Sequence, residues 1–419
     1  MGRKYLGRIA DKVLNSALEA SGAVLIEGPK WCGKTWTAEN RAASVLSMQD
    51  PDNEEAYILS AYTKPSLLLK GDTPRLIDEW QTAPVLWDAV RHAVDIRGEA
   101  GQFILTGSSV PKDRAVKHTG TGRISRMMMR PMSLFESSES NGAVSLGSLF
   151  GDDDVEGESQ LTIERLAFTL ARGGWPATIG QKDHVALRRA HDYVDSVINT
   201  DISRVDGVEK DPERVRALMR SLARNMSSAA KITTIKDDVD IEGSLSDKTV
   251  SSYLNALRRI FVAEDLPAWY PSMRSKAILR TSPKRHFVDP SIAAAALNAS
   301  PESLLRDFRT FGLLFESLCI RDLRVYAQAT DGNVYYYRDN TDLEIDAIIY
   351  LRDGRWGAVE VKMGTNDIDK AAANLKALRD KVDASVMREP SFLMILTAGK
   401  YTYRRDDGVH VVPIGCLRD

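Results

Sequence analysis

The segment that most constrains the fold of this chain is a loop at residues 28–35, which reads Gly-Pro-Lys-Trp-Cys-Gly-Lys-Thr. It fits the pattern of a glycine, any four residues and then Gly-Lys-Ser/Thr. An apolar run at residues 23–26 precedes the loop, and residues 36–40 can open a helix. The sequence therefore predicts a strand, a loop and a helix in succession, an arrangement in which backbone N–H groups and a helix N-terminus bind phosphate.

The residue types within this loop indicate that the phosphate belongs to ATP. Lys34 is expected to reach the β and γ phosphates, and the Thr35 hydroxyl is expected to ligate Mg²⁺. A glycine-rich surface turn is the alternative interpretation. The predicted nucleotide-binding residues are Gly28, Pro29, Lys30, Trp31, Cys32, Gly33, Lys34 and Thr35.

A second motif lies at the end of another apolar strand, where residues 76–79 read Leu-Ile-Asp-Glu. P-loop ATPases place an aspartate that supports Mg²⁺ and a glutamate that activates water at such a strand end. Asp78 and Glu79 are predicted to take these roles. Residues 103–108 repeat the arrangement, and Thr106 or Ser108 is expected to sense the γ-phosphate or orient water. An ordinary polar strand exit explains the third segment equally well.

Basic residues are frequent between positions 110 and 136. ATPases of this kind complete their site with an arginine from a neighbouring subunit, which stabilises charge in the transition state. Arg123 is the preferred candidate for this role. A solvated basic loop is the alternative.

The composition excludes several classes of protein. With 43% hydrophobic and 27% charged residues over 419 positions, the chain is expected to be globular and to form several domains. Its net charge of -2 gives no global signal of nucleic-acid binding, so such binding would depend on local patches. Three widely spaced cysteines indicate a reducing compartment. We find neither a run of transmembrane length nor a signal-peptide core, and expect a cytoplasmic protein without membrane contact.

The middle of the chain changes character twice. Residues 138–160 are rich in Ser, Gly, Asp and Glu, which predicts a mobile insertion or linker. Helical patterns follow from residue 163 to about 204, interrupted by Gly173-Gly174-Trp175-Pro176. A small helical lid behind an ATPase core would have this pattern.

Residues 211–290 show the element order of a winged helix. A helical pattern at residues 212–225 is followed by a second helix near residue 247 and by short strands with basic residues, among them Lys284. The polar face of the second helix and the hairpin are predicted to contact DNA. Packing against protein only is the alternative. The predicted DNA-binding residues are Lys248, Ser251, Ser252, Asn255, Arg259, Arg274 and Lys276.

The last third of the chain carries another constellation. Strand patterns at residues 342–350 and 356–362 flank an Asp-Gly turn, which predicts a hairpin. Asp346, Glu360 and Lys362 fall where this hairpin can bring them together, and a helix at residues 311–318 can add Glu316. Two carboxylates, here Asp346 and Glu360, beside a lysine can bind a divalent metal and polarise a phosphodiester. Whether such a site cuts stays open, because Glu-x-Lys is common on solvated strands.

Together these motifs resemble the prokaryotic AAA-type ATPases that carry a C-terminal domain of unknown function with a restriction-endonuclease-like core. The resemblance covers most of the chain. It depends on residues 28–35, 76–81, 105–109, 122–123, 131–136, 173–176 and 287–290, and on Asp346 with Glu360-Val361-Lys362.

The resemblance implies ATP binding and hydrolysis, with Asp78 and Glu79 as the acidic pair, a winged-helix segment and a PD-(D/E)xK-like terminal domain. The chain departs from the family pattern in two places. Thr106 and Ser108 stand where many AAA proteins have Asn, and the linker at residues 138–160 is longer than usual. The predicted fold class is α/β multidomain, with a P-loop AAA-type parallel sheet core at residues 1–137, a linker and helical lid at 138–205, a winged-helix domain at 206–290 and a PD-(D/E)xK nuclease-like domain at 291–419.

Three functions are compatible with this organisation. The first is a Mg²⁺-dependent ATPase that forms a homo-oligomeric ring, taken as a hexamer, and acts on branched or single-stranded DNA. Its catalytic residues would be Lys34, Glu79, Thr106 and, from a neighbouring subunit, Arg123. The second is an ATP-dependent DNA nuclease that cuts at the terminal carboxylates. The third is a nucleotide-gated protein-interaction module without DNA activity.

Overall fold

The computed structural model of the protein describes residues 5–108, 119–151, 155–205, 210–240, 246–271, 281–383, 385 and 387–419. The chain divides into two compact units. The first contains residues 1–131, 200–209 and 255–262, and the second contains residues 132–199, 210–254 and 263–419. Within the described ranges, no helix has both the length and the apolar character needed to cross a bilayer.

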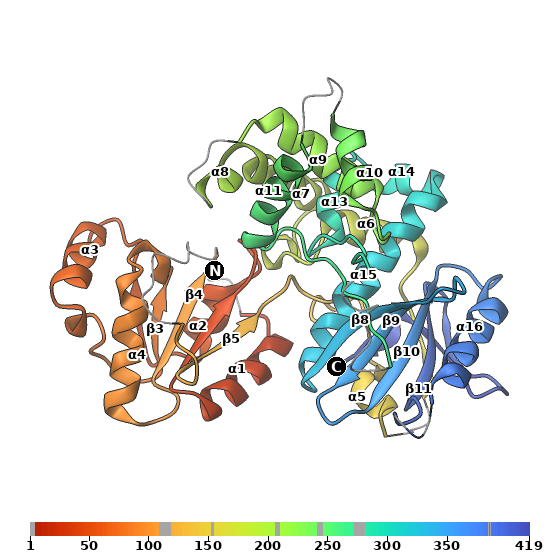
Figure 1. Ribbon diagram of the computed structural model, residues 1–419, viewed down its shortest axis with the longest axis horizontal. Coiled ribbons are helices and arrows are strands. Elements are labelled where there is room, and N and C mark those ends of the chain that lie inside the picture. Colours follow the sequence, from red (N-terminus) through yellow and green to blue (C-terminus); the bar gives the residue numbers. More distant parts are fainter. Residues whose placement is uncertain are drawn as a thin grey trace. The chain divides into compact units, whose positions relative to one another are not determined.

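The first unit contains a sheet of five parallel strands in the order β2-β3-β4-β1-β5 (Figure 1). The strands are β1 (Ala23–Glu27), β2 (Ser44–Ser47), β3 (Arg75–Asp78), β4 (Phe103–Gly107) and β5 (Ile124–Met128). The helices are α1 (Ile9–Ala20), α2 (Lys34–Arg41), α3 (Glu54–Thr63) and α4 (Val85–Arg97), with 3₁₀ turns at Pro65–Leu67 and Trp80–Thr82. The predicted α/β fold with a parallel core is confirmed.

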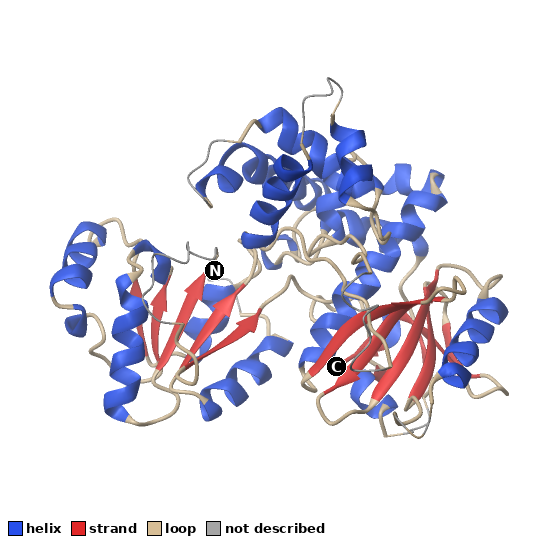
Figure 2. Ribbon diagram, in the orientation of Figure 1, coloured by secondary structure: helices blue, strands red, loops and turns tan. Residues whose placement is uncertain are grey.

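Alternation along the central strand explains why helices cover both faces of this sheet. Val24 and Ile26 face α1 and α2, whereas Ala23 and Leu25 face α3 and α4. Because consecutive side chains of a strand point to opposite faces, an uninterrupted apolar run produces a strand buried on both sides. The sheet is therefore the middle of three layers (Figure 2).

A helical layer of the second unit is built around α13, which packs against α6, α7, α9 and α15. Its helices are α6 (Ile163–Arg172), α7 (Asp183–Ser196), α9 (Pro212–Arg224), α10 (Ile232–Val239), α13 (Pro290–Ala296), α14 (Pro301–Arg306) and α15 (Phe308–Gln328). A π-helical turn at Val197–Asp201 and the short α8 (Ile202–Arg204) follow α7, and α11 (Asp247–Arg259) has residues in both units.

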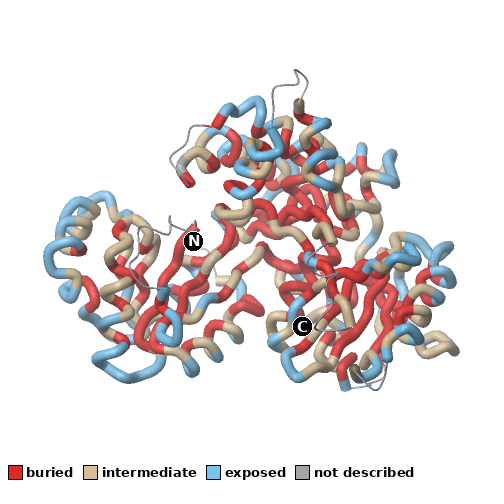
Figure 3. The backbone as a smooth tube through the Cα atoms, in the orientation of Figure 1, coloured by how far each residue is buried: buried red, intermediate tan, exposed pale blue. Residues whose placement is uncertain are grey.

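The second unit also contains a seven-stranded mixed sheet in the order β7-β12-β13-β11-β10-β9-β8. Strands β10, β11 and β13 are parallel, and the other pairs are antiparallel. Helix α16 (Ile368–Lys381) packs on one apolar face, and α15 contacts β8, β9 and β10 (Figure 1). The strands are β7 (Gly157–Glu158), β8 (Gly332–Arg338), β9 (Glu344–Leu351), β10 (Trp356–Lys362), β11 (Phe392–Thr397), β12 (Tyr401–Arg404) and β13 (His410–Pro413). Strands β9, β10, β11 and β13 are buried along most of their length, whereas β7 and β12 are largely accessible (Figure 3).

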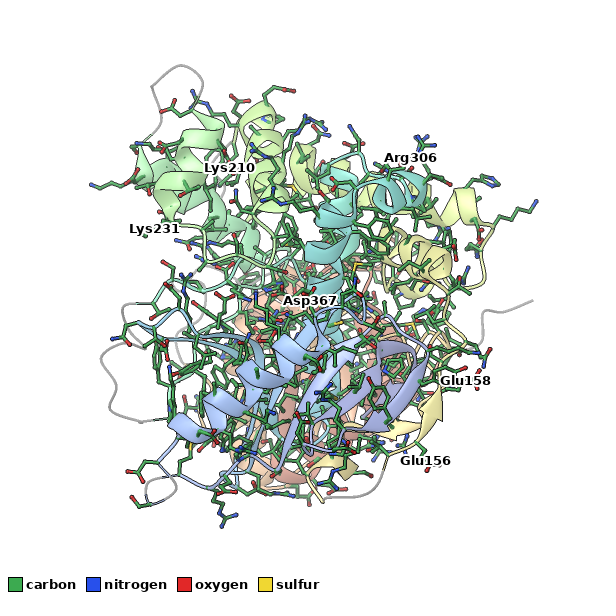
Figure 4. The ribbon with its side chains drawn as sticks, turned by 90° about the vertical axis from the view of Figure 1, so that its right-hand side faces the viewer. Glu156, Glu158, Lys210, Lys231, Arg306 and Asp367 are labelled. Carbon is green, nitrogen blue, oxygen red and sulfur yellow. The ribbon has the colours of Figure 1, made fainter. Side chains whose placement is uncertain are left out.

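The structure differs from the predicted linker at residues 138–160. Strand β6 (Val144–Ser145), with α5 (Leu146–Leu149) directly after it, pairs with β14 (Leu417–Arg418), and β7 extends the terminal sheet beyond β12. Figure 4 labels Glu158 on this edge strand, where its carboxylate lies 2.8 Å from Lys400 Nζ. Ser145 and Glu158 are thus polar residues of short strands, and Glu158 lies on an edge strand, where alternate side chains face water.

The short strands predicted after α11 are only isolated bridges in the described part of the chain. Ala263 bridges Phe287 and Leu266 bridges Lys284, while Ala268 bridges Tyr336 of β8. The Trp269 side chain packs in the core of the terminal sheet. Ala268 and Trp269 therefore belong with the terminal sheet, because one pairs with its strand β8 and the other is buried in its core.

Three of the sequence motifs meet in one buried network of the second unit. Met132 N–H donates to Gly174 O at 2.6 Å, and Gly174 N–H donates to Asp289 Oδ2 at 3.0 Å. The Arg321 guanidinium joins Asp289 at 2.8 Å to Asp322 at 2.7 Å. This cluster can be buried because its charges are paired and its backbone N–H groups are hydrogen-bonded. These motifs therefore have a structural role in the second unit.

Candidate functional site

The phosphate loop leaves β1 at a position that only glycine can occupy. Gly28 has a φ of 154°, and a Cβ atom there would lie 2.1 Å from Met129 O. Gly33 has a φ of 101° and is the N-cap of α2. The two glycines thus turn the chain tightly between the strand and the helix, and the first helical residue is Lys34.

Lys34 points back into the loop. Its Nζ donates to Gly28 O at 3.0 Å and to Pro29 O at 2.8 Å, and only 6% of the residue is exposed. Backbone carbonyls therefore hold the ammonium inside the turn where phosphate is predicted to bind. The arrangement places a buried positive charge beside a helix N-terminus, which favours an anion.

The acidic pair lies at the carboxyl end of β3, beside this loop. Thr35 Oγ1 donates to Asp78 Oδ1 at 2.8 Å, and Thr106 Oγ1 donates to the same oxygen. Thr106 Oγ1 also accepts the Glu79 N–H at 3.3 Å. Because β4 lies between β1 and β3, the hydroxyl at its end links the two motifs.

Glu79 is held by its backbone and by its neighbours. Its φ of 54° is left-handed, and its carboxylate accepts from Gln81 Nε2 and, at 3.4 Å, from Ser108 Oγ. A non-glycine residue in this conformation is uncommon and costs free energy, which is a feature of functional positions. Gln81 was not predicted, although its place two residues after the acidic pair was a usable signal.

The residues at this edge fit a bound Mg²⁺. A threonine hydroxyl and a carboxylate are hard oxygen ligands of the kind that Mg²⁺ takes together with phosphate oxygens and water. In the structure Thr35 and Asp78 already lie within hydrogen-bonding distance of one another. A metal ion bound with nucleotide would therefore have these two side chains as its protein neighbours.

Sequence reasoning missed residues that contact this loop, among them Arg8. Arg8 Nη1 donates to Cys32 O and Arg8 Nη2 donates to Arg130 O, both at 2.8 Å. Arg8 precedes α1 and belongs to no motif, so only the fold could identify it. Of the predicted loop residues, Lys30 pairs with Asp201 at 2.6 Å, and Trp31 is half exposed.

Arg123 lies at the N-terminal end of the parallel strands, whereas the phosphate loop of the same subunit lies at their carboxyl end. Its carbonyl accepts the N–H of Ala23, the first residue of β1, whereas the loop follows the last residue of that strand. Its side chain is half exposed and pairs with Asp95 at 2.7 Å. Arg123 therefore cannot reach its own nucleotide site, and a role in a neighbouring subunit's site stays a prediction.

The predicted polar face of α11 is exposed to solvent. Lys248, Ser252 and Asn255 are exposed, while Val250 and Leu254 are buried on the other face. Ser251 and Arg259 are partly buried. Arg274 and Lys276 lie outside the described residues.

The structure brings the predicted terminal residues into one cluster. Glu360 and Lys362 lie on β10, Asp346 on β9 and Glu316 on α15. Lys362 Nζ lies 2.6 Å from Glu360 Oε2 and 3.4 Å from Asp346 Oδ2. Asp346 Oδ2 also accepts the Val361 N–H at 2.9 Å. The antiparallel pairing of the two strands thus produces the predicted convergence.

A lysine that was predicted as a basic hairpin residue occupies the middle of this cluster. Lys284 Nζ lies 2.7 Å from Glu344 Oε1, 2.9 Å from Glu316 Oε1 and 3.2 Å from Asp346 Oδ1. Only 2% of Lys284 is exposed, so it is not available on the surface. Neither Lys284 nor Glu344 was predicted here, because the contact joins segments that are distant in sequence.

Burial and the neighbouring charges shift the pKa values of the cluster in different directions. Burial, reinforced by the Asp346 carboxylate, raises the pKa of Glu316 to about 8. Burial likewise raises the pKa of Glu360 to about 7. Burial also acts to raise the pKa of Asp346, but the ammonium groups of Lys284 and Lys362 hold it well below its usual range.

The predicted metal site at Asp346 and Glu360 does not fit this arrangement. Each of the two carboxylates already accepts from an ammonium group, and Lys284 occupies the point on which Glu316, Glu344 and Asp346 converge. Over the described ranges, no group of three or more His, Cys, Asp or Glu side chains is placed to hold a metal ion. We therefore derive no metal-dependent step at this cluster.

Comparisons with known proteins assign the first unit. Residues 20–138 match the family model of an AAA domain. Residues 163–303 and 311–417 match two domains of unknown function, DUF8612 and DUF4143. No curated protein matches the chain. A solved Walker-type ATPase of Pyrococcus abyssi is similar over 70% of this chain and 96% of its own, at 14% identity and a TM-score of 0.44. The AAA match contains the loop and the acidic pair, so the first unit carries an ATPase-like AAA domain.

Proposed function

We propose that this protein is a Mg²⁺-dependent ATPase of the AAA type that assembles into a homo-oligomer and acts on DNA. The observation that carries the proposal is the hydrogen bond of 2.8 Å between Thr35 Oγ1 and Asp78 Oδ1, beside a buried lysine. It joins the two sequence motifs that ATP hydrolysis requires at one edge of a parallel sheet.

Each residue of the site has a chemical role in this proposal. Lys34 leaves the loop carbonyls to bind the β and γ phosphates, and Glu79 accepts a proton from the attacking water. Gln81 and Ser108 orient the Glu79 carboxylate through their hydrogen bonds to it. Thr106 holds Asp78 in place. When Mg²⁺ is bound, it supplies positive charge that offsets charge on the phosphates.

The test of the ATPase proposal is the turnover of Lys34→Ala. Loss of the ammonium should abolish phosphate release, because Lys34 is the lysine that the proposal places on the β and γ phosphates, and its Nζ already lies inside the loop turn. Lys70→Ala, at an exposed position of the same unit, is the matched control and should hydrolyse ATP at the normal rate. Unchanged ATP turnover in Lys34→Ala would contradict the proposed ATPase site.

DNA is proposed as the target because α11 presents an exposed polar face. Lys248, Ser252 and Asn255 lie on one side of this helix, and α10 precedes it as in a helix-turn-helix. Lys248→Glu should weaken DNA binding, and the affinity should fall steeply with salt. Fluorescence anisotropy with duplex, branched and single-stranded DNA measures both effects.

The control for this experiment is Lys370→Glu, which makes the same charge change at an exposed position of α16. Equal loss of affinity in both variants would indicate a general charge effect without a role for α11. If the protein binds none of the three DNA forms, the third function, a nucleotide-gated protein-interaction module, would replace DNA binding.

We also propose that the terminal sheet has the core of a restriction-endonuclease-like domain. Support comes from Asp346, Glu360 and Lys362, which lie on two adjacent strands with Glu316 on the helix beside them. This is the order of acidic and basic groups in a PD-(D/E)xK site.

A further inference from the structure

We propose that Lys284 is the resident cation of the terminal carboxylate cluster. Its ammonium group takes the place that a divalent metal ion takes in a nuclease, so the terminal domain neither binds such an ion there nor cuts DNA. The inference depends on the nuclease-like arrangement proposed above and is independent of ATP hydrolysis.

The hydrogen-bonding capacity of Lys284 matches its surroundings. An ammonium group has three N–H donors. The side-chain carboxyl groups around it are Glu316 at 2.9 Å, Glu344 at 2.7 Å and Asp346 at 3.2 Å. The Tyr336 ring lies below it, with the centroid 5.6 Å from Nζ. Every donor therefore has an ionisable acceptor, and the carboxylates are satisfied without a metal.

The backbone fixes Lys284 in this position. Its N–H donates to Leu266 O at 3.0 Å, and Leu266 N–H donates to Lys284 O at 2.9 Å. The Tyr336 hydroxyl donates to the carbonyl of Ser282, two residues earlier. A buried lysine needs paired charge to offset the loss of water, and here the pairing is complete. The Lys284 ammonium group is thus held in a fixed position inside the core.

A second lysine, Lys362, also disfavours a divalent ion at this cluster. Lys362 Nζ contacts Glu360 and Asp346, so Asp346 accepts from two ammonium groups. The remaining Glu360 oxygen accepts from Asn374 Nδ2 at 3.1 Å. A divalent ion needs oxygens at about 2.0–2.6 Å. It would have to displace Lys284 and would be repelled by Lys362.

The experiment is a titration of the nucleotide-free protein with Mn²⁺, in which free Mn²⁺ is measured by electron paramagnetic resonance. We expect the wild type and Asp346→Asn to bind Mn²⁺ equally weakly. Lys284→Met, which keeps the length of the side chain and removes the charge, should bind Mn²⁺ at least about tenfold more tightly. The double variant Lys284→Met, Asp346→Asn should lose this gain.

Either of two Mn²⁺-binding results would overturn the inference. One is a wild-type Mn²⁺ site that is weakened tenfold by Asp346→Asn, and this comparison decides the question even if Lys284→Met does not fold. The other is a folded Lys284→Met variant with no gain in Mn²⁺ binding. Plasmid cleavage by the wild type in Mn²⁺, lost in Glu360→Gln, would contradict the inference in the same way. Loss of ATP turnover in any sample bears on the proposed ATPase and leaves this inference unaffected.

Discussion

The hydroxyl of Thr35 donates a hydrogen bond of 2.8 Å to Asp78 Oδ1. Thr35 lies in the first turn of α2, and Asp78 is the last residue of β3. The contact crosses the end of β4, the strand between β1 and β3, where Thr106 donates to the same carboxylate oxygen. The Asp78 carboxylate thus accepts a hydrogen bond from a hydroxyl in each of two motifs. Its removal should disturb the positions of Thr35 and Thr106 alike.

Asp78→Asn should reduce ATP turnover by about 100-fold or more, because a neutral amide supports Mg²⁺ poorly and its oxygen accepts more weakly from the two hydroxyls than a carboxylate oxygen does. A coupled phosphate-release assay at several Mg²⁺ concentrations measures the change. Asp72→Asn, at an exposed position, is the control and should leave turnover unchanged. A normal rate in Asp78→Asn would show that the metal is held by other groups.

Arg123 should act on the nucleotide of a neighbouring subunit, because it lies at the opposite end of the parallel strands from its own phosphate loop. Arg123→Ala alone should reduce turnover by about 1,000-fold. A mixture of Arg123→Ala and Lys34→Ala subunits should regain part of the activity, since one subunit supplies the arginine and the other the intact loop. Steady-state turnover of the mixture measures this. No recovery in exchanging oligomers would contradict a role in trans.

Glu316 should make the second unit less stable as the pH rises. Its pKa is raised from 4.5 to about 8, so the native protein keeps a proton that the unfolded chain loses. Between these values the native state binds more protons, and the free energy of unfolding therefore falls with increasing pH, by at most about 1.4 kcal/mol per pH unit.

Glu316→Gln removes this contribution. Melting temperatures of the wild type and the variant between pH 5.5 and 8.5 should therefore shift in favour of the variant as the pH rises. Glu164→Gln, on the exposed face of α6, should follow the wild type at every pH. A difference between Glu316→Gln and wild type that does not change with pH would contradict the raised pKa.

Asp322→Ala should destabilise the second unit by about 3–5 kcal/mol, because it leaves the buried Arg321 with one carboxylate fewer and removes the acceptor of the Leu134 N–H. Urea denaturation measures the loss. Asp369→Ala is the control, because it breaks an ion pair between Arg405 and an Asp369 side chain that is 91% exposed. It should change the free energy of unfolding by no more than about 0.5 kcal/mol. Equal effects would show that the buried network does not stabilise the fold.

The first unit was largely predictable from sequence. Its motifs are local, since a glycine loop between an apolar strand and a helix specifies its own geometry, and the parallel sheet follows from alternating strands and helices. Asp78 and Glu79 were predicted because they lie together at the end of such a strand. Arg8 escaped prediction, because a guanidinium that binds loop carbonyls leaves no pattern in the chain.

The second unit was less predictable because its contacts join distant segments. Residues 138–160 have the composition of a linker, yet they pair with strands at the far end of the chain. Short polar edge strands carry too little apolar periodicity to be recognised. The basic hairpin was read from its charge, which cannot show that Lys284 turns inward.

The sequence by itself determined the parallel α/β core with its phosphate-loop motif, and it predicted the residues for ATP binding and hydrolysis, because those groups lie within short segments of fixed geometry. Only the tertiary structure decided what lies between the terminal carboxylates. Lys284 reaches Glu316, Glu344 and Asp346 through a bridge to Leu266 and the packing of α15 on the sheet. A charge is buried only where the fold surrounds it with partners, and no local pattern encodes that.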